Sequence, residues 1–350
     1  MDLNLWPIIK IFVITTITFT TAMLATPLLT HFLYKYRLGK EIRPASNAPI
    51  FYEHHQQKSG TPTMGGIIIW LVVLFWALLF FFLAKFFSFS LFYDLNFLSR
   101  AQTWLPLGAL IAAALIGLVD DFFNVKKIGP NGGGLRMKHR LLLYTIIALV
   151  AAYWFYFKLD WDLLHLAFLG TWSVGWWYIP IITLVIVATS FSVNETDGLD
   201  GLAGGVLVTN FVTFGAIAFM QGKIELAVLC GAIVGALLAF LWFNISPARF
   251  FMGDTGAMAL GVTLGIIAIL TNSLFILPIT GIILVLESLS VIIQVLSKKI
   301  RGKKVFQSAP WHHHLEAIGW PEYKIVMRFW VVSGVASVVG FVLFLIDYYI

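Results

Sequence analysis

The sequence predicts an all-α membrane protein that crosses the bilayer about ten times. Of its 350 residues, 60% are hydrophobic and only 11% are charged, and the mean hydropathy is +0.90. These values lie outside the range of soluble globular domains. Because no soluble segment, low-complexity tail or internal repeat interrupts the pattern, we expect a single integral membrane domain over residues 1–350.

Apolar runs along the chain support this number of crossings. A helix needs about 20 apolar residues to cross the hydrocarbon core, so ten spans use about 200 residues. The first run carries only Lys10 near its start and has no small-residue cleavage site, so we expect it to remain as a span. Cys230, the only cysteine, lies within an apolar run and is expected to be a packing residue. We predict spans near residues 8–33, 64–84, 103–119, 141–157, 177–193, 203–220, 225–243, 255–272, 274–297 and 327–349.

The basic residues fall mainly on one side of these spans. Five alternate loops hold 18 of the 23 lysines and arginines when flanking Arg328 is included. The positive-inside bias therefore predicts that these loops are cytoplasmic and that both termini face outward. The longest outward loops, 86–102 and 159–176, are aromatic, as expected for side chains at the headgroup level. The five loops that we predict to be cytoplasmic are 34–62, 120–140, 194–202, 244–254 and 298–326.

Four of the predicted cytoplasmic segments are rich in glycine. They read GTPTMGG from Gly60, GPNGGG from Gly129, NETDGLDG from Asn194 and FMGDTG from Phe251. Glycine allows tight turns that expose backbone N–H groups, which is how protein loops approach phosphate oxygens. Four such segments on one side, each beside a helix end, predict a site for a polyanion.

Acidic side chains gather at the same ends of the spans. Asp120 and Asp121 stand at the carboxyl end of a helix, where the helix dipole disfavours negative charge, so we expect a cation beside them. Asp197, Asp200 and Asp254 precede new spans, and helix capping is an alternative explanation for each of them. Carboxylates without cysteine or spaced histidine ligands favour a hard ion, and magnesium completed by phosphate oxygens fits best.

Several other polar residues on this side are candidates for binding substrate. Lys58 and Lys138 could contact phosphate, and Asn194 and Asn244 could contact a sugar or base. Consecutive His312, His313 and His314 do not share one helical face, which disfavours zinc and favours hydrogen bonds to phosphate or sugar oxygens. For the basic run from Lys298 to Lys304, topology and attraction to anionic lipid remain an alternative.

Glu287 is the acidic residue that we place near mid-membrane. Ser290 and Gln294 follow it at helical spacing, so the three side chains form a polar stripe on one face of the helix. A stripe of this kind packs against a neighbouring helix or faces a groove for a lipid tail. The sequence leaves both alternatives open.

Taken in order, these motifs resemble the phospho-N-acetylmuramoyl-pentapeptide transferase family, within the polyprenyl-phosphate sugar-1-phosphate transferase superfamily. The resemblance extends from about Lys35 to Trp330, and its motifs are highly specific. It implies ten transmembrane helices in a bacterial inner membrane, with both termini periplasmic and the active site at the cytoplasmic face. The motifs are GTPTMGG, the paired aspartates, NETDGLDGLA, FNISPARFFMGDTG and SAPWHHHLEAIGWPEYKIVMRFW.

The resemblance also implies a reaction. Undecaprenyl phosphate would attack UDP-N-acetylmuramoyl-pentapeptide to give lipid I and UMP, with Mg²⁺ as cofactor, usually in a homodimer and with no nucleic-acid partner. By motif position, Asp120, Asp121 and Asp254 would be catalytic, and Asp121 and Asp254 would hold the metal. The substrate-contacting positions would be Lys58, Thr63, Asn194, Asp197, Asn244, His312, His313 and His314, in addition to Lys138, which is a candidate from its charge and place in the loop alone.

Four residues depart from the pattern that is usual in this family. Lysine is frequent at the position of Asn124, leucine at Glu195, an aliphatic residue at Trp311 and serine at Ala257. None of these departures removes a candidate catalytic group. Glu195 places an additional negative charge beside the predicted nucleotide site.

Two mechanisms and three other functions remain to be distinguished. We favour direct in-line attack by the lipid phosphate over a covalent aspartyl intermediate.

The nearest alternative function is that of a related enzyme, which transfers N-acetylglucosamine-1-phosphate. A transporter would place its ionisable groups at mid-membrane in two related halves, which this sequence does not show, and a purely structural scaffold would not need the aspartates.

Overall fold

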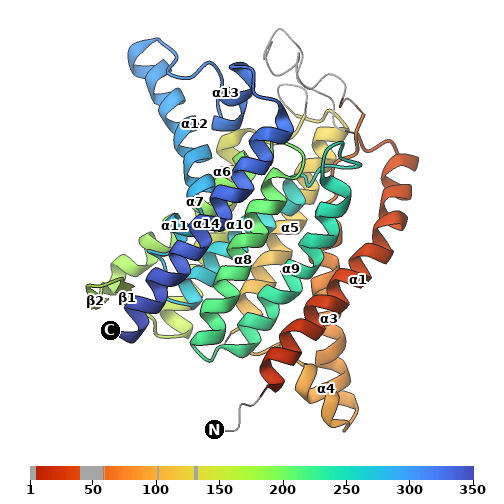
Figure 1. The fold of residues 1–350 in the computed structure, drawn as a ribbon, viewed down its shortest axis with the longest axis vertical. Helices are drawn as coiled ribbons and strands as arrows, with labels where there is room; N and C mark the ends of the chain where they lie inside the picture. Colours follow the sequence, from red (N-terminus) through yellow and green to blue (C-terminus); the bar gives the residue numbers. More distant parts are fainter. Residues whose placement is uncertain (1–4, 40–57, 59, 101, 130–132) are drawn as a thin grey trace.

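The computed structural model describes residues 5–39, 58, 60–100, 102–129 and 133–350, most of which are helical. The helices stand side by side as a bundle, with a small hairpin at one end (Figure 1). In the hairpin, β1 (Leu163–Leu166) pairs antiparallel with β2 (Gly170–Ser173). The helices are α1 (Trp6–Lys35), α3 (Ile67–Phe86), α4 (Ser90–Leu95), α5 (Trp104–Val125), α6 (Met137–Tyr153), α7 (Tyr178–Thr196), α8 (Leu202–Met220), α9 (Ile224–Asn244), α10 (Asp254–Leu270), α11 (Leu277–Thr280), α12 (Ile282–Arg301), α13 (Trp311–Ala317) and α14 (Glu322–Tyr349).

Eight helical segments in the described part of the chain are long and apolar enough to cross a membrane. They confirm an all-α, multi-pass membrane architecture. Helix α10, with 17 residues, is apolar but shorter than a full span. The eight segments are Trp6–Lys35, Ile67–Phe86, Trp104–Val125, Met137–Lys158, Gly175–Thr196, Leu202–Met220, Ile224–Asn244 and Glu322–Tyr349.

The predicted span 274–297 is wrong as a single helix. The chain breaks at Gly281, which separates short α11 from α12. Helix α12 has a reversed amphipathic pattern: Glu287 and Gln294 are buried, whereas aliphatic side chains such as Leu289 are exposed. The mean hydropathy of residues 274–297 does not reveal this break, because hydropathy depends on side chains and not on the direction of the backbone.

Helix α10 is the core of the bundle. Every residue from Asp254 to Leu270 is buried, and α5 and α7 pack against it. Two glycines of α10 allow the close approach of α7: a Cβ at Gly261 would lie 2.6 Å from the Ser190 Cα, and one at Gly265 would lie 2.5 Å from the Thr189 hydroxyl. Small residues at such contacts are typical of helix packing in membranes.

Helix α5 approaches α10 at Gly117. A Cβ at this position would lie 2.3 Å from the carbonyl oxygen of Asp254, so only glycine fits there. The contact brings the last turn of α5, which carries Asp120 and Asp121, to the first turn of α10. The aspartates from two distant parts of the chain therefore meet because two backbones touch.

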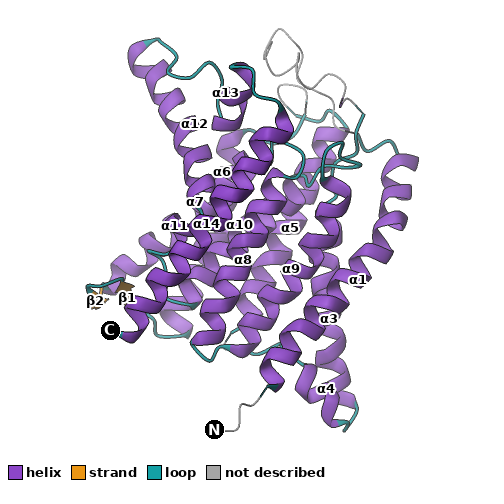
Figure 2. Cartoon of the chain, in the orientation of Figure 1, coloured by secondary structure: helices purple, strands orange, loops and turns teal. Residues whose placement is uncertain are grey.

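The two ends of the bundle differ in their connections. Helix α1 begins and α14 ends at the same end, the lower one in Figure 1, where the hairpin also lies. Long connecting loops gather at the opposite end (Figure 2). Two elements were not predicted within the aromatic segments 86–102 and 159–176, namely α4 and the β1–β2 hairpin. Trp172, Trp176 and Trp177 in the second segment are exposed, as expected for side chains that face lipid headgroups.

We expect Gly117→Leu to destabilise the protein strongly, because its side chain would force α5 away from α10. Overpacking of this kind typically costs about 1–3 kcal/mol. The measurement is the apparent melting temperature of the detergent-solubilised protein. Gly108→Leu is the matched control in the same helix, since a Cβ at Gly108 meets nothing within 4 Å. Equal melting temperatures for the two variants would show that the α5–α10 contact is not tight.

Candidate active site

Arg140 lies at the centre of the acidic cluster. Its Nε is 2.7 Å from Asp120 Oδ2, and its second terminal nitrogen is 2.9 Å from Asp254 Oδ2. A third nitrogen donates weakly to Asn194 Oδ1 at 3.5 Å. One guanidinium thus connects the first turn of α6 with the ends of α5, α7 and α10. Its single positive charge lies between the two carboxylates and offsets part of their mutual repulsion.

Asp121 organises the start of α10. Its Oδ1 accepts the Asp254 N–H at 3.1 Å, and its Oδ2 accepts the Thr255 N–H at 3.0 Å. The Thr63 hydroxyl lies at 3.4 Å from Oδ1. A carboxylate at a helix N-terminus satisfies amide groups that have no partner within the helix and is favoured by the dipole. Asp121 therefore caps a helix other than its own, which its position near the end of α5 does not reveal.

A glycine beside this cap allows the carboxylate to approach. Gly253 precedes α10 with φ of +74°, and a Cβ there would lie 2.5 Å from Asp121 Oδ2. Both the left-handed backbone and the short distance require glycine. The GD pair of the FMGDTG motif is thus explained by how α10 starts.

Asp120 and Asp254 have different surroundings from Asp121. Asp120 Oδ1 accepts the Leu135 N–H at 2.5 Å, so the carboxylate also holds the turn before α6. Asp254 Oδ1 accepts the side-chain amide of Asn194 at 2.6 Å. Both side chains are largely buried, and their second oxygens converge on Arg140. Asp120 and Asp254 are therefore the two carboxylates whose oxygens face a common cation.

This donor set fits a hard divalent ion. Magnesium in proteins is usually held by one or two carboxylates while water and substrate phosphates complete its shell. Asp120 and Asp254 supply two convergent oxygens. Within the described residues, no three acidic, histidine or cysteine side chains lie close enough together to hold a metal by themselves. The remaining ligands would have to come from a phosphorylated substrate or water.

Lys58 does not lie free for a phosphate. Its ammonium contacts Asp200 Oδ1 at 2.8 Å and Glu322 Oε1 at 2.6 Å. Asp200 Oδ2 also accepts the Ala248 N–H, and no side chain caps α8, which begins after Gly201. Helix capping by Asp200 is therefore wrong: this carboxylate forms an ion pair that joins three segments of the chain.

Asn244 connects the neighbouring loops. Its Oδ1 accepts the Gly201 N–H at 3.0 Å, and its Nδ2 donates to the Phe250 carbonyl at 2.9 Å. This buried amide links the turn after α7 to the segment that leads into Asp254. Asp197 ends α7 in the same turn, four residues before Gly201. Lys138, by contrast, is exposed on the first turn of α6.

The three histidines have three different environments. His312 pairs with Glu287, its Nδ1 lying 2.9 Å from Oε2. His313 Nδ1 lies 2.7 Å from Glu316 Oε2. The ring of His314 packs beside Phe306 and Trp311. As predicted from their consecutive positions, the histidines do not converge on one ligand.

The polar stripe of α12 packs against protein rather than facing a groove. Gln294 accepts the N–H groups of Val305 and Phe306 and donates to the Phe306 carbonyl. Glu287 is fully buried against His312. These contacts favour the packing alternative, with the difference that Gln294 meets the segment before α13 and Glu287 meets α13 itself, which is not a spanning helix.

Sequence reasoning missed Arg140, Glu322 and the partner of Glu287. A signal for Arg140 was available, since a basic residue in the first turn of a helix opposes the dipole and calls for a nearby anion. The same physical reason predicts a cation beside Asp120 and Asp121 at the end of α5. Glu322 had no such signal, because an acidic residue at a helix N-terminus is already explained by the dipole.

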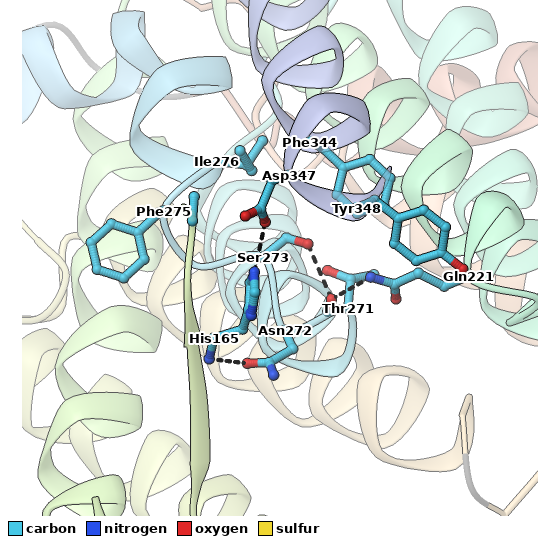
Figure 3. A pocket seen from close by; sticks show the side chains of 11 residues that line it. His165, Gln221, Thr271, Asn272, Ser273, Phe275, Ile276, Phe344, Asp347 and Tyr348 are labelled. Carbon is cyan, nitrogen blue, oxygen red and sulfur yellow. Dashed lines mark hydrogen bonds and ion pairs between the residues drawn. The ribbon is translucent and has the colours of Figure 1, made fainter. Parts of the chain in front are cut away.

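A cavity lies at the other end of the bundle, beside the hairpin and the end of α14 (Figure 3). It has a volume of about 260 Å³ and is lined by His165, Thr271, Asn272 and Asp347, among others. His165 Nε2 lies 2.6 Å from Asp347 Oδ2. None of the predicted site residues lines this cavity, so the aspartates and the cavity belong to separate regions.

The fold and the acidic site together define the class of protein: a multi-pass, mostly helical membrane protein in which aspartates from two distant segments meet at the loop end of the bundle. The family model described as glycosyl transferase family 4 matches residues 103–272. These residues include Asp120, Arg140, Asn194 and Asp254. The model for signature 1 of phospho-N-acetylmuramoyl-pentapeptide-transferase matches residues 58–69.

Individual relatives narrow this class to one family. Each of the following proteins carries the name phospho-N-acetylmuramoyl-pentapeptide-transferase. The one from Shouchella clausii is 38% identical over 330 residues, covering 93% of this chain and 94% of its own. Those from Geobacillus thermodenitrificans and Chloroflexus aggregans are 37% and 36% identical, covering 93% and 90% of this chain and 94% and 84% of theirs. The chain belongs to the phospho-N-acetylmuramoyl-pentapeptide-transferase family.

We expect Arg140→Gln to destabilise the protein by about 2 kcal/mol or more, because it leaves two buried carboxylates without their cation. The apparent melting temperature in detergent at neutral pH measures this loss. Lys138→Gln, on the same helix but exposed, is the matched control. Adding Asp120→Asn to Arg140→Gln removes one of the opposed charges, so the double variant should melt above Arg140→Gln alone. A double variant that melts lower would contradict the ion-pair account.

Proposed function

We propose that this protein transfers phospho-N-acetylmuramoyl-pentapeptide from its UDP-linked precursor to undecaprenyl phosphate. The products are lipid I and UMP, and the reaction is the first membrane step of peptidoglycan synthesis. The proposal rests mainly on the names of relatives that share more than a third of their residues with nearly all of this chain. The convergence of Asp120 and Asp254 supports it, since a phosphoryl-transfer enzyme needs such a charged site.

The membrane setting follows from the same proposal. We place the protein in the bacterial inner membrane, with the aspartate cluster at the cytoplasmic face and both termini in the periplasm. In support, the start of α1 and the end of α14 lie at the end of the bundle opposite the loops that carry most basic residues.

We also propose that the enzyme works as a homodimer, which the molar mass of the protein in detergent would test.

The bonds in this reaction balance without a further reactant. An oxygen of the lipid phosphate forms a bond to the sugar-side phosphorus, and the bond from that phosphorus to the oxygen of the UMP leaving group breaks. One diphosphate is lost and another is made, so no energy-rich cofactor is needed. The lipid phosphate is already an anion near neutral pH and therefore needs little help from a general base. We favour this direct in-line attack.

Charge neutralisation is then the main task of the site. Two phosphorylated substrates would repel Asp120, Asp121 and Asp254 unless cations offset the charge. A magnesium ion would supply Lewis-acid stabilisation of the phosphate oxygens, and Asp120 and Asp254 are the residues whose oxygens would hold it. Asp121 would act through the backbone, because its oxygens orient the first amide groups of α10. Arg140 would hold the two carboxylates in place and offset part of their charge.

The geometry also bears on a covalent route. Asp120 Oδ1 is occupied by the Leu135 amide, and its Oδ2 is in contact with Arg140. A carboxylate held in this way is a weaker nucleophile than a free one, which supports direct attack over an aspartyl intermediate. Trapping of a phosphosugar-enzyme adduct in the absence of lipid phosphate would overturn this choice.

The decisive experiment is release of UMP by the purified protein with undecaprenyl phosphate and Mg²⁺. We expect release with UDP-N-acetylmuramoyl-pentapeptide and its abolition by a chelator. Release with UDP-N-acetylglucosamine alone would assign the protein to the related activity instead. Release with neither donor would refute the proposed transfer.

We expect Asp254→Asn to lower this activity by about a hundredfold or more, because it removes charge where the phosphates must be neutralised. Asp160→Asn is the control, since Asp160 is exposed in the segment before the hairpin. Initial rates of UMP release at saturating substrates give the comparison. Activity of Asp254→Asn within a few-fold of the control would exclude Asp254 from the catalytic site.

A further inference from the structure

A buried carboxylate holds His312 from two sides. Glu287 on α12 and His312 on α13 are both fully buried. Glu287 Oε2 lies 2.9 Å from the ring Nδ1, and the backbone N–H of His312 points at the two carboxylate oxygens at 3.3 and 3.4 Å. The carboxylate therefore determines both the position of the residue and the orientation of its ring. It also sets Nδ1 as the protonated nitrogen, since a carboxylate accepts hydrogen bonds.

The other ring nitrogen faces the turn between α7 and α8. A Cβ built on Gly198 would lie 2.2 Å from His312 Nε2, so the ring occupies the space of a missing side chain. Among the described residues, Nε2 is buried and has no hydrogen-bond partner. Buried polar atoms are nearly always paired, and an exception calls for an explanation. We explain it by a partner that arrives with the substrate.

The Gly198 turn belongs to the candidate active site. Asn194, which binds Asp254, is four residues earlier on α7, and Asp197 immediately precedes Gly198. Gly201, three residues later, is held by Asn244. An atom bound by His312 Nε2 would thus lie beside the turn that also carries the predicted nucleotide-side residues.

The charges around His312 favour its protonated form. Burial lowers the pKa of His312, but the Glu287 carboxylate raises it, with smaller contributions from Glu316 on α13 and Glu195 on α7. The net effect is a pKa above the usual value. The ring of His313, 4.1 Å away between centroids, is a further titratable group beside it, and Asp197 immediately precedes Gly198 in the turn that faces the ring. Protonated His312 presents Nε2–H as a charged donor, which suits an anionic oxygen.

We infer that Glu287 is a positioning residue for the transfer reaction: it holds His312 so that Nε2–H donates to an anionic oxygen of the nucleotide-sugar donor beside the Gly198 turn. The inference rests on the proposed function and adds to it a role for a residue on α12. Glu287 itself touches no reacting atom. Its effect passes through the orientation and charge of one histidine, as a carboxylate behind a ligating or catalytic imidazole does elsewhere.

The test is the pH profile of kcat/KM for the donor in Glu287→Gln. Glutamine keeps the size and an acceptor oxygen but removes the charge, so the pKa of His312 should fall. In the wild type, the charge on His312 is present below its raised pKa and is lost as the pH rises through that value. The variant should lose the charge at lower pH. We expect a loss of about tenfold or more at pH 8 and a clearly smaller one at pH 6, with KM for the lipid acceptor unchanged.

Asp347→Asn is the matched control. It removes the carboxylate from the other histidine–carboxylate pair, His165–Asp347, at the opposite end of the bundle. We expect this variant to keep the wild-type pH profile. A folded Glu287→Gln protein with an unshifted profile, or with the same loss at every pH, would overturn the inference while leaving the transfer reaction intact. An inactive wild type would instead refute the proposed function and this inference with it.

A second variant serves if Glu287→Gln does not fold. Gly198→Ala leaves Glu287 in place but puts a methyl group where Nε2 now lies, so it should raise KM for the donor and leave KM for the acceptor unchanged. The wild-type protein offers a third measurement, in which KM for the donor rises as the pH increases through the pKa of His312. A donor KM unaffected by Gly198→Ala and by pH would also overturn the inference.

Discussion

The site depends on one constraint, the placement of negative charge at the end of a buried helix. Asp121 caps α10 through two backbone amides, and this cap positions Asp254 as the first residue of the helix. Gly117 and Gly253 allow the approach, because any side chain at either position would collide with the cap or with Asp254. The three aspartates thus have distinct tasks although two of them are adjacent in sequence. One orients the backbone, and two direct oxygens toward a common cation.

Arg140 lowers the free-energy cost of burying Asp120 beside Asp254. Burying two carboxylates side by side is costly, and a guanidinium between them offsets part of the repulsion. Its nitrogens reach both Asp120 and Asp254, so one side chain holds the ends of two helices together. The same logic applies at Lys58, where two carboxylates share one ammonium. At both places one cation joins two carboxylates from different segments of the chain.

Helix α12, which contacts the segment that carries His312, has its polar side chains buried and its aliphatic side chains exposed. In water this pattern would be unstable, but beside lipid the aliphatic face is favoured and the polar side chains must find partners within the protein. Glu287 and Gln294 find them in the segment that carries His312. The buried polar face of α12 and the orientation of the histidine therefore have the same cause, the pairing of Glu287 with His312.

The sequence by itself determined the membrane class, most of the spans, the family and the identities of Asp120, Asp121 and Asp254 as neighbours of a site. Hydropathy, helix dipoles and motif order are local properties, so they can be read along the chain. Only the tertiary structure decided that Asp121 caps a different helix, that Gly281 breaks a predicted span, and that Arg140 and Glu287 pair with the aspartates and with His312. Each of these features depends on contacts between segments that are far apart in sequence. The residues of one segment do not specify which other segment will contact it.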